Sequence, residues 1–535
     1  MKFTYKHSAL LLIINSLLCI SCSDSFLDRQ SLVAMSERDF WKTEQDAKNA
    51  LAACYDGLQD PFLYGGDPWK FGPLNMDCMT DNGGHFNWSG WMAGYDICNG
   101  IHTPSSWLVK SYWMSSYEEI KRCNDLIAKI EPIQMDDAQK AIYKAEAIVL
   151  RSLIYTNLTI TYNDVPYLTS PILSIADTKV PKTDRETIVT SVINDLKDAA
   201  NVLPESAPAW GRVTKGAALS VLGRLALYNK MWDEAINAYR QVKGLGYSLY
   251  TGEYKDLFTE ANEQCSEIIM SVRYQGPGVG EGNSFGVHYD APMEAMNGTI
   301  DLADAFYSTN GKPYTDRSKE SIAPIKSDGN LDLDWPYGER YNDRDPRLKA
   351  TLFTPYQGWK DNWAPYGGAA ASYSTLYVMK YYNPYLNSST SWDNGQDFYI
   401  IRYAEVLLSL AEALVEKGGY DYDEITGLID DIRNRAHMPT IQEVEGSTGQ
   451  LDQAGLREVI RHERRVETAF EGLRLFDLYR WKELENSKNR INKEAQDYGF
   501  WYEYRNHRGD MEYIWPIPQY EIDSNPDLEQ CELWK

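Results

Sequence analysis

The sequence predicts a mostly α-helical protein: a scaffold of paired helices interrupted by one large, irregular, loop-rich segment. Two observations support this prediction. Long amphipathic runs, with apolar residues three and four apart, fill most of residues 36–243 and return from residue 399. Between residues 244 and 398, by contrast, Gly, Pro, Asn, Asp, Tyr and Trp crowd together without a sustained period.

An export signal occupies the start of the chain. A short basic stretch precedes the apolar run SALLLIINSLLCI, which is too short to span a bilayer comfortably. Ser21 stands directly before Cys22, as in a bacterial lipobox, although Cys19 replaces the usual leucine. We interpret residues 1–21 as a lipoprotein signal peptide and Cys22 as the lipidated first residue of the mature chain. An ordinary secretory signal cut nearby is the alternative.

The mature chain begins with a predicted helical-repeat region, residues 22–243. The string SERDFWKTEQDAKNALAACYDGL opens with Ser36, a favourable N-cap, and DDAQKAIYKAEAIVLRSLIYTNLTITY is a long amphipathic run. Further on, apolar residues at i, i+3, i+4 and i+7 define one helix face: Ala218, Val221, Leu222 and Leu225. Ala235 and Tyr239 keep the spacing of a tetratricopeptide hairpin. Repeated helix pairs are therefore expected.

One part of this region, the aromatic loop 61–107, has no clean helical or strand period. Its stretch MTDNGGHFNWSGW places two indole rings among Gly, Asn and His. The second irregular part, residues 244–398, is predicted to be an insertion packed on the helical frame, because its many aromatic residues argue against disorder. Helices return in the closing region, residues 399–535, where YIIRYAEVLLSLAEALVEKGG ends in two glycines.

Charge and cysteine content limit the kinds of partner. The formal net charge of −24 argues against nucleic acid, whose phosphates require a basic surface. Cys19 and Cys22 belong to the export segment, and the remaining cysteines include no CxxC motif, so a zinc ribbon is not indicated. We expect buried free thiols, with a Cys78–Cys98 disulfide as the alternative.

Several strings follow one another along nearly the whole chain: DFWKTEQDAKNALAACYDGL, AEAIVLRSLIYTNLTITYNDVPYLT, GRVTKGAALSVLGRLALY, NDRDPRL, IRYAEVLLSLAEAL, ERRVETAFEGLRLFDLYRW and PIPQYEIDSNPDL. Together they resemble the SusD/RagB family of outer-membrane lipoproteins of the Bacteroidetes, with Asn163 where the family usually has glycine. The resemblance implies about four tetratricopeptide-like helix pairs and an irregular ligand-binding portion packed against them.

The resemblance also implies a role. Proteins of this family sit on the cell surface and capture an oligosaccharide, or sometimes a peptide. They act as a lid over a SusC-like TonB-dependent barrel during uptake. They are not enzymes and need no cofactor. We therefore expect a lipid-anchored, surface-exposed protein of the outer membrane that binds a glycan. Peptide capture is the alternative, and a surface glycoside hydrolase is a less favoured one.

The aromatic loop suits a sugar ligand. An indole ring is a rigid flat surface that stacks on the apolar face of a pyranose ring, and Trp88 and Trp91 would provide it. Polar neighbours would bond the hydroxyl groups at the edge of the sugar: Asn82, His85 and Asn87. The insertion offers further stacking candidates: Tyr289, Trp359 and Trp363, with Trp335 and Tyr366 nearby. Other tryptophans lie in helical strings and are assigned to packing: Trp41, Trp232 and Trp481.

The sequence contains no convincing metal-binding or catalytic motif. The segment SDGNLDLDW lacks the EF-hand order, so structural calcium at its carboxylates is not supported: Asp328, Asp332 and Asp334. His462 lacks the second histidine of a zinc-protease helix. The charged residues around it at helical spacing are interpreted as salt-bridge partners rather than catalytic groups: Arg461, Glu463, Arg464, Glu467, Glu471 and Arg474.

Overall fold

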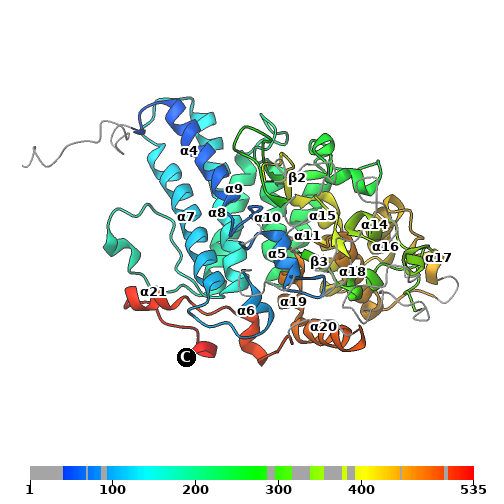
Figure 1. Cartoon of the computed structure of the whole chain (residues 1–535). Coiled ribbons are helices and arrows are strands. Elements are labelled where there is room, and N and C mark those ends of the chain that lie inside the picture. Colours follow the sequence, from blue (N-terminus) through cyan, green and yellow to red (C-terminus); the bar gives the residue numbers. More distant parts are fainter. Residues whose placement is uncertain are drawn as a thin grey trace, which may run out of the picture.

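The computed structural model describes residues 40–67, 70–85, 93–285, 296–315, 338–354, 376–381, 392–445, 449–498 and 504–535. Within these ranges the protein is mostly helical, which confirms the predicted fold class. Figure 1 shows the N-terminal helices α4 (Glu44–Asp56), α7 (Trp107–Lys129) and α8 (Asp137–Thr161) at one end of the molecule, and elements of the insertion and of the closing region at the other. Among the described residues, no helix is both long and apolar enough to cross a bilayer.

A stack of helices forms the scaffold, and from α7 to α11 each helix packs on the next one in the chain. Its first part consists of α4 (Glu44–Asp56), α7 (Trp107–Lys129), α8 (Asp137–Thr161), α9 (Arg185–Val202), α10 (Lys215–Tyr228) and α11 (Trp232–Lys243). The stack continues through α15 (Tyr403–Lys417), which packs on α11, and through α16 (Tyr422–Arg435) and α18 (Gln453–Glu467), which pack on α15. The irregular insertion thus interrupts the chain but not the stack.

Short polar side chains fix where these helices begin. Thr43 accepts a hydrogen bond from the Asp46 amide and forms a capping box with it. The helix α4 thus begins at Glu44, and Ser36 lies outside the described residues. The same kind of cap starts other scaffold helices: Asp136 for α8, Asp184 for α9, Thr214 for α10, Asp421 for α16 and Asp452 for α18.

Shorter elements pack against the scaffold. The helices are α5 (Pro73–Cys78), α6 (Tyr95–Cys98), α13 (Ile300–Ala305), α14 (Arg347–Thr351), α17 (Ile441–Glu445), α19 (Arg474–Trp481), α20 (Leu484–Tyr498) and α21 (Gln519–Ser524). One antiparallel pair joins β2 (Ile268–Val272) to β6 (Phe398–Arg402). A second, four-stranded sheet has the order β1 (Gly83–His85), β3 (Met296–Gly298), β5 (Tyr377–Val378) and β4 (Leu352–Phe353).

The core is one continuous apolar cluster that includes both the scaffold and the shorter elements. Trp41 and Trp232 pack against it, as predicted, and the indole N–H of Trp481 donates a hydrogen bond to Glu412 at 2.8 Å. Cys78 and Cys98 are buried free thiols, which confirms that interpretation over a disulfide.

A buried cluster of opposite charges, here called the Arg402 cluster, ties the insertion to the scaffold. Its members are Glu267, Asp345, Arg347, Lys380, Arg402, Arg435, Glu463, Glu467 and Glu471. Arg402, at the end of β6, donates to Glu467 at 2.6 Å and to Glu471 at 2.7 Å. Arg347 of α14 donates to Glu467 at 2.9 Å. Guanidinium groups from several elements therefore converge on the end of α18.

The other three predicted salt-bridge residues, Arg461, Arg464 and Arg474, also form ion pairs, so this interpretation is confirmed. Arg464 donates to Asp477 at 2.7 Å, and Arg474 donates to Asp81 at 2.8 and 2.9 Å. Burial alone would raise the pKa of Glu467, but Arg435, Arg402 and Arg347 outweigh it and hold this pKa well below its usual value. Glu467 is therefore ionised in the folded protein at neutral pH, and its negative charge offsets the buried arginines around it.

Replacing Glu467 with glutamine should destabilise the protein strongly. The substitution keeps the shape but leaves buried cations without their shared counter-charge, and breaking a buried pair in this way costs about 3–5 kcal/mol. Urea unfolding at neutral pH measures the loss. Glu529→Gln is the control: Glu529 lies 3.3 Å from Lys535 with 75% of its side chain exposed, so its change should stay within about 1 kcal/mol. Equal effects of the two changes would contradict the assigned role.

The free energy of unfolding should also decrease as the solution becomes acidic. Because the folded-state pKa of Glu467 lies below the unfolded value, its contribution is fully present above about pH 4.5 and is lost as pH falls through the folded pKa. Urea unfolding between pH 7 and pH 3 measures the slope. In Glu467→Gln this acid-dependent loss should shrink. An unchanged slope would assign the acid sensitivity to other carboxyl groups.

Candidate functional site

The four-stranded sheet brings together the chain positions that flank the predicted ligand-binding segments. His85, the last residue of β1, pairs with Met296, the first residue of β3. Residues 86–92 therefore leave the sheet beside the point where residues 286–295 return to it. The strands β4 and β5 pair in turn, and residues 355–375 connect them. Sequence segments more than 200 residues apart thus share one small base.

Close backbone packing makes this base compact. The register places Gly83 opposite Gly298 and Asn297 opposite Tyr377. A Cβ atom on Gly298 would lie 2.3 Å from a methyl carbon of Leu352, so only glycine fits there without moving the neighbouring strand residue. Each strand has two or three residues, so the sheet spans only about 7–10 Å along its strands.

Asp81, two residues before β1, is the anion on which several arginines converge. The segment from Cys78 to His85, which contains Asp81 and β1, is here called the loop base. Arg474 of α19 binds both of its carboxylate oxygens, at 2.8 and 2.9 Å, and Arg490 of α20 and Arg465 of α18 also pair with it. Asp81 is fully buried. Burial would raise its pKa, but the arginines, first Arg465 and Arg474, hold this pKa well below the usual range. The start of β1 is therefore fixed to three C-terminal helices.

The side chain of Arg505 binds the backbone of the same segment. Its guanidinium donates to the carbonyl oxygens of Thr80 at 2.5 Å, Gly83 at 2.9 Å and Cys78 at 3.3 Å. The side chain of Arg505 is buried. One cation thus satisfies three carbonyl groups at the entrance of β1, which gives the following segment a rigid starting point.

Most of the predicted contact residues lie outside the described ranges: Asn87, Trp88, Trp91, Tyr289, Trp359 and Trp363. The same holds for Cys22 and for the acidic segment with Asp328, Asp332 and Asp334. The structure describes the backbone of His85, in β1. Ligand contact by these side chains stays a prediction. What the structure adds is the shared sheet at their chain ends.

Asn82 differs from the exposed edge group that the sequence predicts. It is fully buried, its amide nitrogen donates to Asp77 at 3.3 Å, and its amide oxygen accepts from Arg465 at 3.0 Å. Its backbone oxygen accepts from the Thr299 amide at 3.1 Å. Asn82 therefore serves the base of the loop in this structure, because its hydrogen-bonding atoms are occupied by protein.

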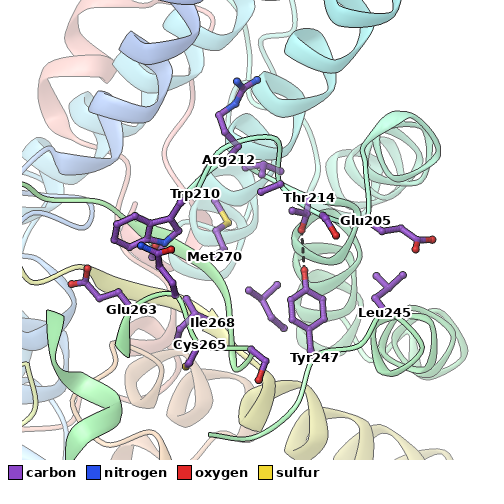
Figure 2. Close-up of a pocket in the computed structure, with 18 of the residues that line it drawn as sticks. Glu205, Trp210, Arg212, Thr214, Leu245, Tyr247, Glu263, Cys265, Ile268 and Met270 are labelled. Atoms are coloured by element: carbon purple, nitrogen blue, oxygen red, sulfur yellow. Dashed lines mark hydrogen bonds between the residues drawn. The ribbon is translucent and has the colours of Figure 1, made fainter. Parts of the chain in front are cut away.

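A hollow region lies around Trp210, in the connection between α9 and α10 (Figure 2). Trp210, Gly211, Arg212 and Ser271 line both of two adjoining cavities, of about 430 and 610 Å³. The guanidinium of Arg273 stacks on the Trp210 ring, 3.8 Å from its centre. Figure 2 shows Trp210 close to Met270 and Glu263, with the Tyr247 and Thr214 hydroxyls bonded at 3.0 Å on the other side.

Two carboxyl groups near this region, Glu263 and Asp397, have raised pKa values. Burial and nearby Asp397 raise the pKa of Glu263 to about 8, and burial raises the pKa of Asp397 to about 7. The Asp397 amide donates to Glu263 at 2.5 Å. No sequence motif distinguishes these residues, and Trp210 stands alone in the string APAWGR. The sequence therefore gave no reason to select them.

Two family patterns match the chain and together span most of it. Residues 266–534 match the family described as "SusD family", and residues 25–227 match the family described as "Starch-binding associating with outer membrane". The first match includes most of the insertion, the four-stranded sheet from β3 onward and the closing helices, and the second includes β1 and the scaffold helices from α4 to α10.

Known proteins are similar over nearly their full length. A SusD-like protein of Formosa agariphila is 26% identical over 99% of both chains, and a second one is 24% identical over 96% of both. The crystal structure of a SusD-like carbohydrate binding protein from Bacteroides fragilis superposes with a TM-score of 0.77 at 26% identity, covering 92% of this chain and 100% of that one.

A laminarin binding SusD-like protein shares the fold with a TM-score of 0.69 at 23% identity, covering 92% of this chain and 99% of the other.

Removing the Arg505 guanidinium should loosen the loop base. In Arg505→Met, three buried carbonyl groups lose their hydrogen-bond donor. Each unsatisfied buried group costs about 1–3 kcal/mol, and relaxation of the structure recovers part of that. We therefore expect the free energy of unfolding to decrease by roughly 2–4 kcal/mol. Hydrogen exchange should rise at the amides of residues 79–85. The control is Lys493→Met, because Lys493 is 71% exposed on α20. Unchanged exchange in Arg505→Met would show that other contacts fix β1.

Proposed function

This chain belongs to the SusD family, and on that premise we propose that it is a cell-surface protein that captures oligosaccharides and delivers them to a SusC-like TonB-dependent transporter in the outer membrane. The observation that carries the proposal is the four-stranded sheet, to which three aromatic-rich segments of the sequence attach. Residues 86–92 and 286–295 join it at the His85–Met296 end, and residues 355–375 join it at the opposite end, where the Gly298 amide donates to Leu376. Relatives described as carbohydrate binding and laminarin binding support the ligand class.

Sugar capture needs flat apolar surfaces and a rigid support. In the proposed site Trp88 and Trp91 stack on sugar rings, and Tyr289, Trp359 and Trp363 extend the platform. His85 and Asn87 bond hydroxyl groups at the edge. The contacts of Asp81 and Arg505 hold the base in place before a ligand arrives, so that less conformational freedom is lost on binding.

Delivery requires attachment at the membrane. In the proposal a lipid on Cys22 anchors the mature chain, and residues 23–39 connect the lipid to the scaffold. The family description that matches residues 25–227 names association with the outer membrane. The protein binds and hands over its ligand without changing it chemically, so the proposed role needs neither catalytic residues nor a cofactor.

A binding screen tests the ligand and the site together. The mature chain from Ser23 onward, without lipid, is titrated with plant, host and microbial oligosaccharides and with peptides. Trp88→Ala/Trp91→Ala should weaken a glycan that binds the wild type by about tenfold or more, because loss of two stacking rings costs at least about 1.4 kcal/mol. Tyr520→Ala, an exposed aromatic on α21, should leave binding unchanged, and thermal unfolding of both variants should match the wild type.

Other outcomes decide against parts of the proposal. A glycan that binds the double variant unchanged would place the site away from Trp88 and Trp91. Binding of peptides and of no glycan would replace the ligand class. Release of shortened oligosaccharides during incubation would identify a glycoside hydrolase instead.

A further inference from the structure

Two cysteines and a glutamate meet in the interface between the first scaffold helices. Cys54 lies on α4, and Glu119 and Cys123 lie on α7, which runs beside α4 in Figure 1. The two sulfur atoms and a carboxylate oxygen all lie within 4.8 Å of one another. Among the described residues, no other three His, Cys, Asp or Glu side chains bring their ligand atoms this close.

Helix geometry explains the meeting. Glu119 and Cys123 are four residues apart, which places them on one face of α7. That face is buried, as is the face of α4 that carries Ala47, Leu51 and Cys54. Cys54 and Cys123 are fully buried and Glu119 is 1% exposed. The group therefore lies in the protein interior, where polar atoms need partners.

Glu119 is only partly satisfied by the protein. One carboxylate oxygen accepts a hydrogen bond from the Cys123 thiol at 3.2 Å. The other, Oε2, is buried without a hydrogen-bond partner and lies 3.8 Å from the Arg122 guanidinium. The chain leaves room for this carboxylate, because a Cβ atom on Gly57 would lie 1.7 Å from Oε2. An interior carboxyl group of this kind is costly unless something completes its environment.

We propose that Cys54, Glu119 and Cys123 form a binding site for a thiophilic divalent cation of the zinc class. Thiolate sulfur and carboxylate oxygen are established zinc ligands, at about 2.3 and 2.0–2.2 Å from the metal. Ligand atoms around such an ion lie roughly 3.4–4 Å apart, a spacing compatible with the 4.8 Å limit of this group. In the proposal, water or the second oxygen of Glu119 completes the coordination.

The charges and protons of the proposed site balance. Binding breaks two S–H bonds, and the two protons pass to the solvent. Two thiolates, one carboxylate and a divalent cation carry a net charge of −1, and the nearby Arg122 guanidinium offsets it. Affinity should therefore increase with pH.

Such an ion would join α4 to α7. Cys54 is three residues from the end of α4, and the other two ligands lie near the middle of α7. The helix α4 is the first scaffold helix after the proposed membrane tether. A metal crosslink at this place would secure the part of the scaffold that the tether pulls on. The binding site itself does not depend on the proposed function.

Titration of the reduced, metal-free mature chain with Cd²⁺ and then Zn²⁺ tests the proposal. We expect one bound ion per chain by elemental analysis, an ultraviolet thiolate-to-cadmium charge-transfer band, release of at least two protons, and a higher unfolding temperature with zinc. A reduced wild-type chain without the band would overturn the proposal. A wild-type chain that resists reduction and lacks two hydrogens by mass would do so as well, since it would indicate a Cys54–Cys123 disulfide.

Matched variants locate the ion. Cys54→Ser and Cys123→Ser should each abolish the band, and Glu119→Gln should weaken binding by about tenfold or more, the effect typical of lost partners around a metal. Cys78→Ser/Cys98→Ser, another pair of buried thiols, should bind as the wild type does. Undiminished binding in Cys54→Ser and Cys123→Ser would overturn the assignment. If a variant does not fold, the titration of the wild-type chain still decides whether the ion binds.

Discussion

Charges removed from water must be paired, and this constraint organises the molecule. The Arg402 cluster lies where the end of β6, the start of β2, and the helices α14, α16 and α18 approach one another. Each guanidinium there faces carboxylates from other parts of the chain. A buried ion pair adds little stability by itself, but a missing partner is very costly. The cluster therefore specifies how the insertion docks on the scaffold more than it strengthens the docking.

The same constraint acts at the loop base. Asp81 precedes β1 by two residues, and arginines from α18, α19 and α20 surround it. Chain segments that are almost 400 residues apart in the sequence are thus held together by one carboxylate. The strand β1 follows this fixed point. Its neighbour in the sheet, β3, leads into α13, whose first amides donate hydrogen bonds to Glu494 of α20. The two contacts fix the β1–β3 pair to the C-terminal helices.

The sequence predicts the scaffold well because helices repeat every 3.6 residues and their caps are local. Residues such as Asp184 and Asp452 indicate a helix start directly. The four-stranded sheet could not be predicted in this way, since strands of two or three residues carry no measurable period. The burial of Asn82 was also missed. Its neighbours in the sequence resemble a polar loop, and its partner Arg465 is 383 residues away. Pairings of this kind are non-local and become visible only in three dimensions.

The short sheet has a consequence for how such a protein acquires a new specificity. The segment 355–375 begins and ends on the paired strands β4 and β5, whose backbones lie about 5 Å apart. Closing a longer segment between two such neighbouring points costs only about 0.6 kcal/mol for each doubling of its length. A change in the length of this segment therefore adds little to the entropic cost of closing it. The scaffold can remain constant while selection exchanges the residues that it presents, in the way that antibody frameworks tolerate different loops.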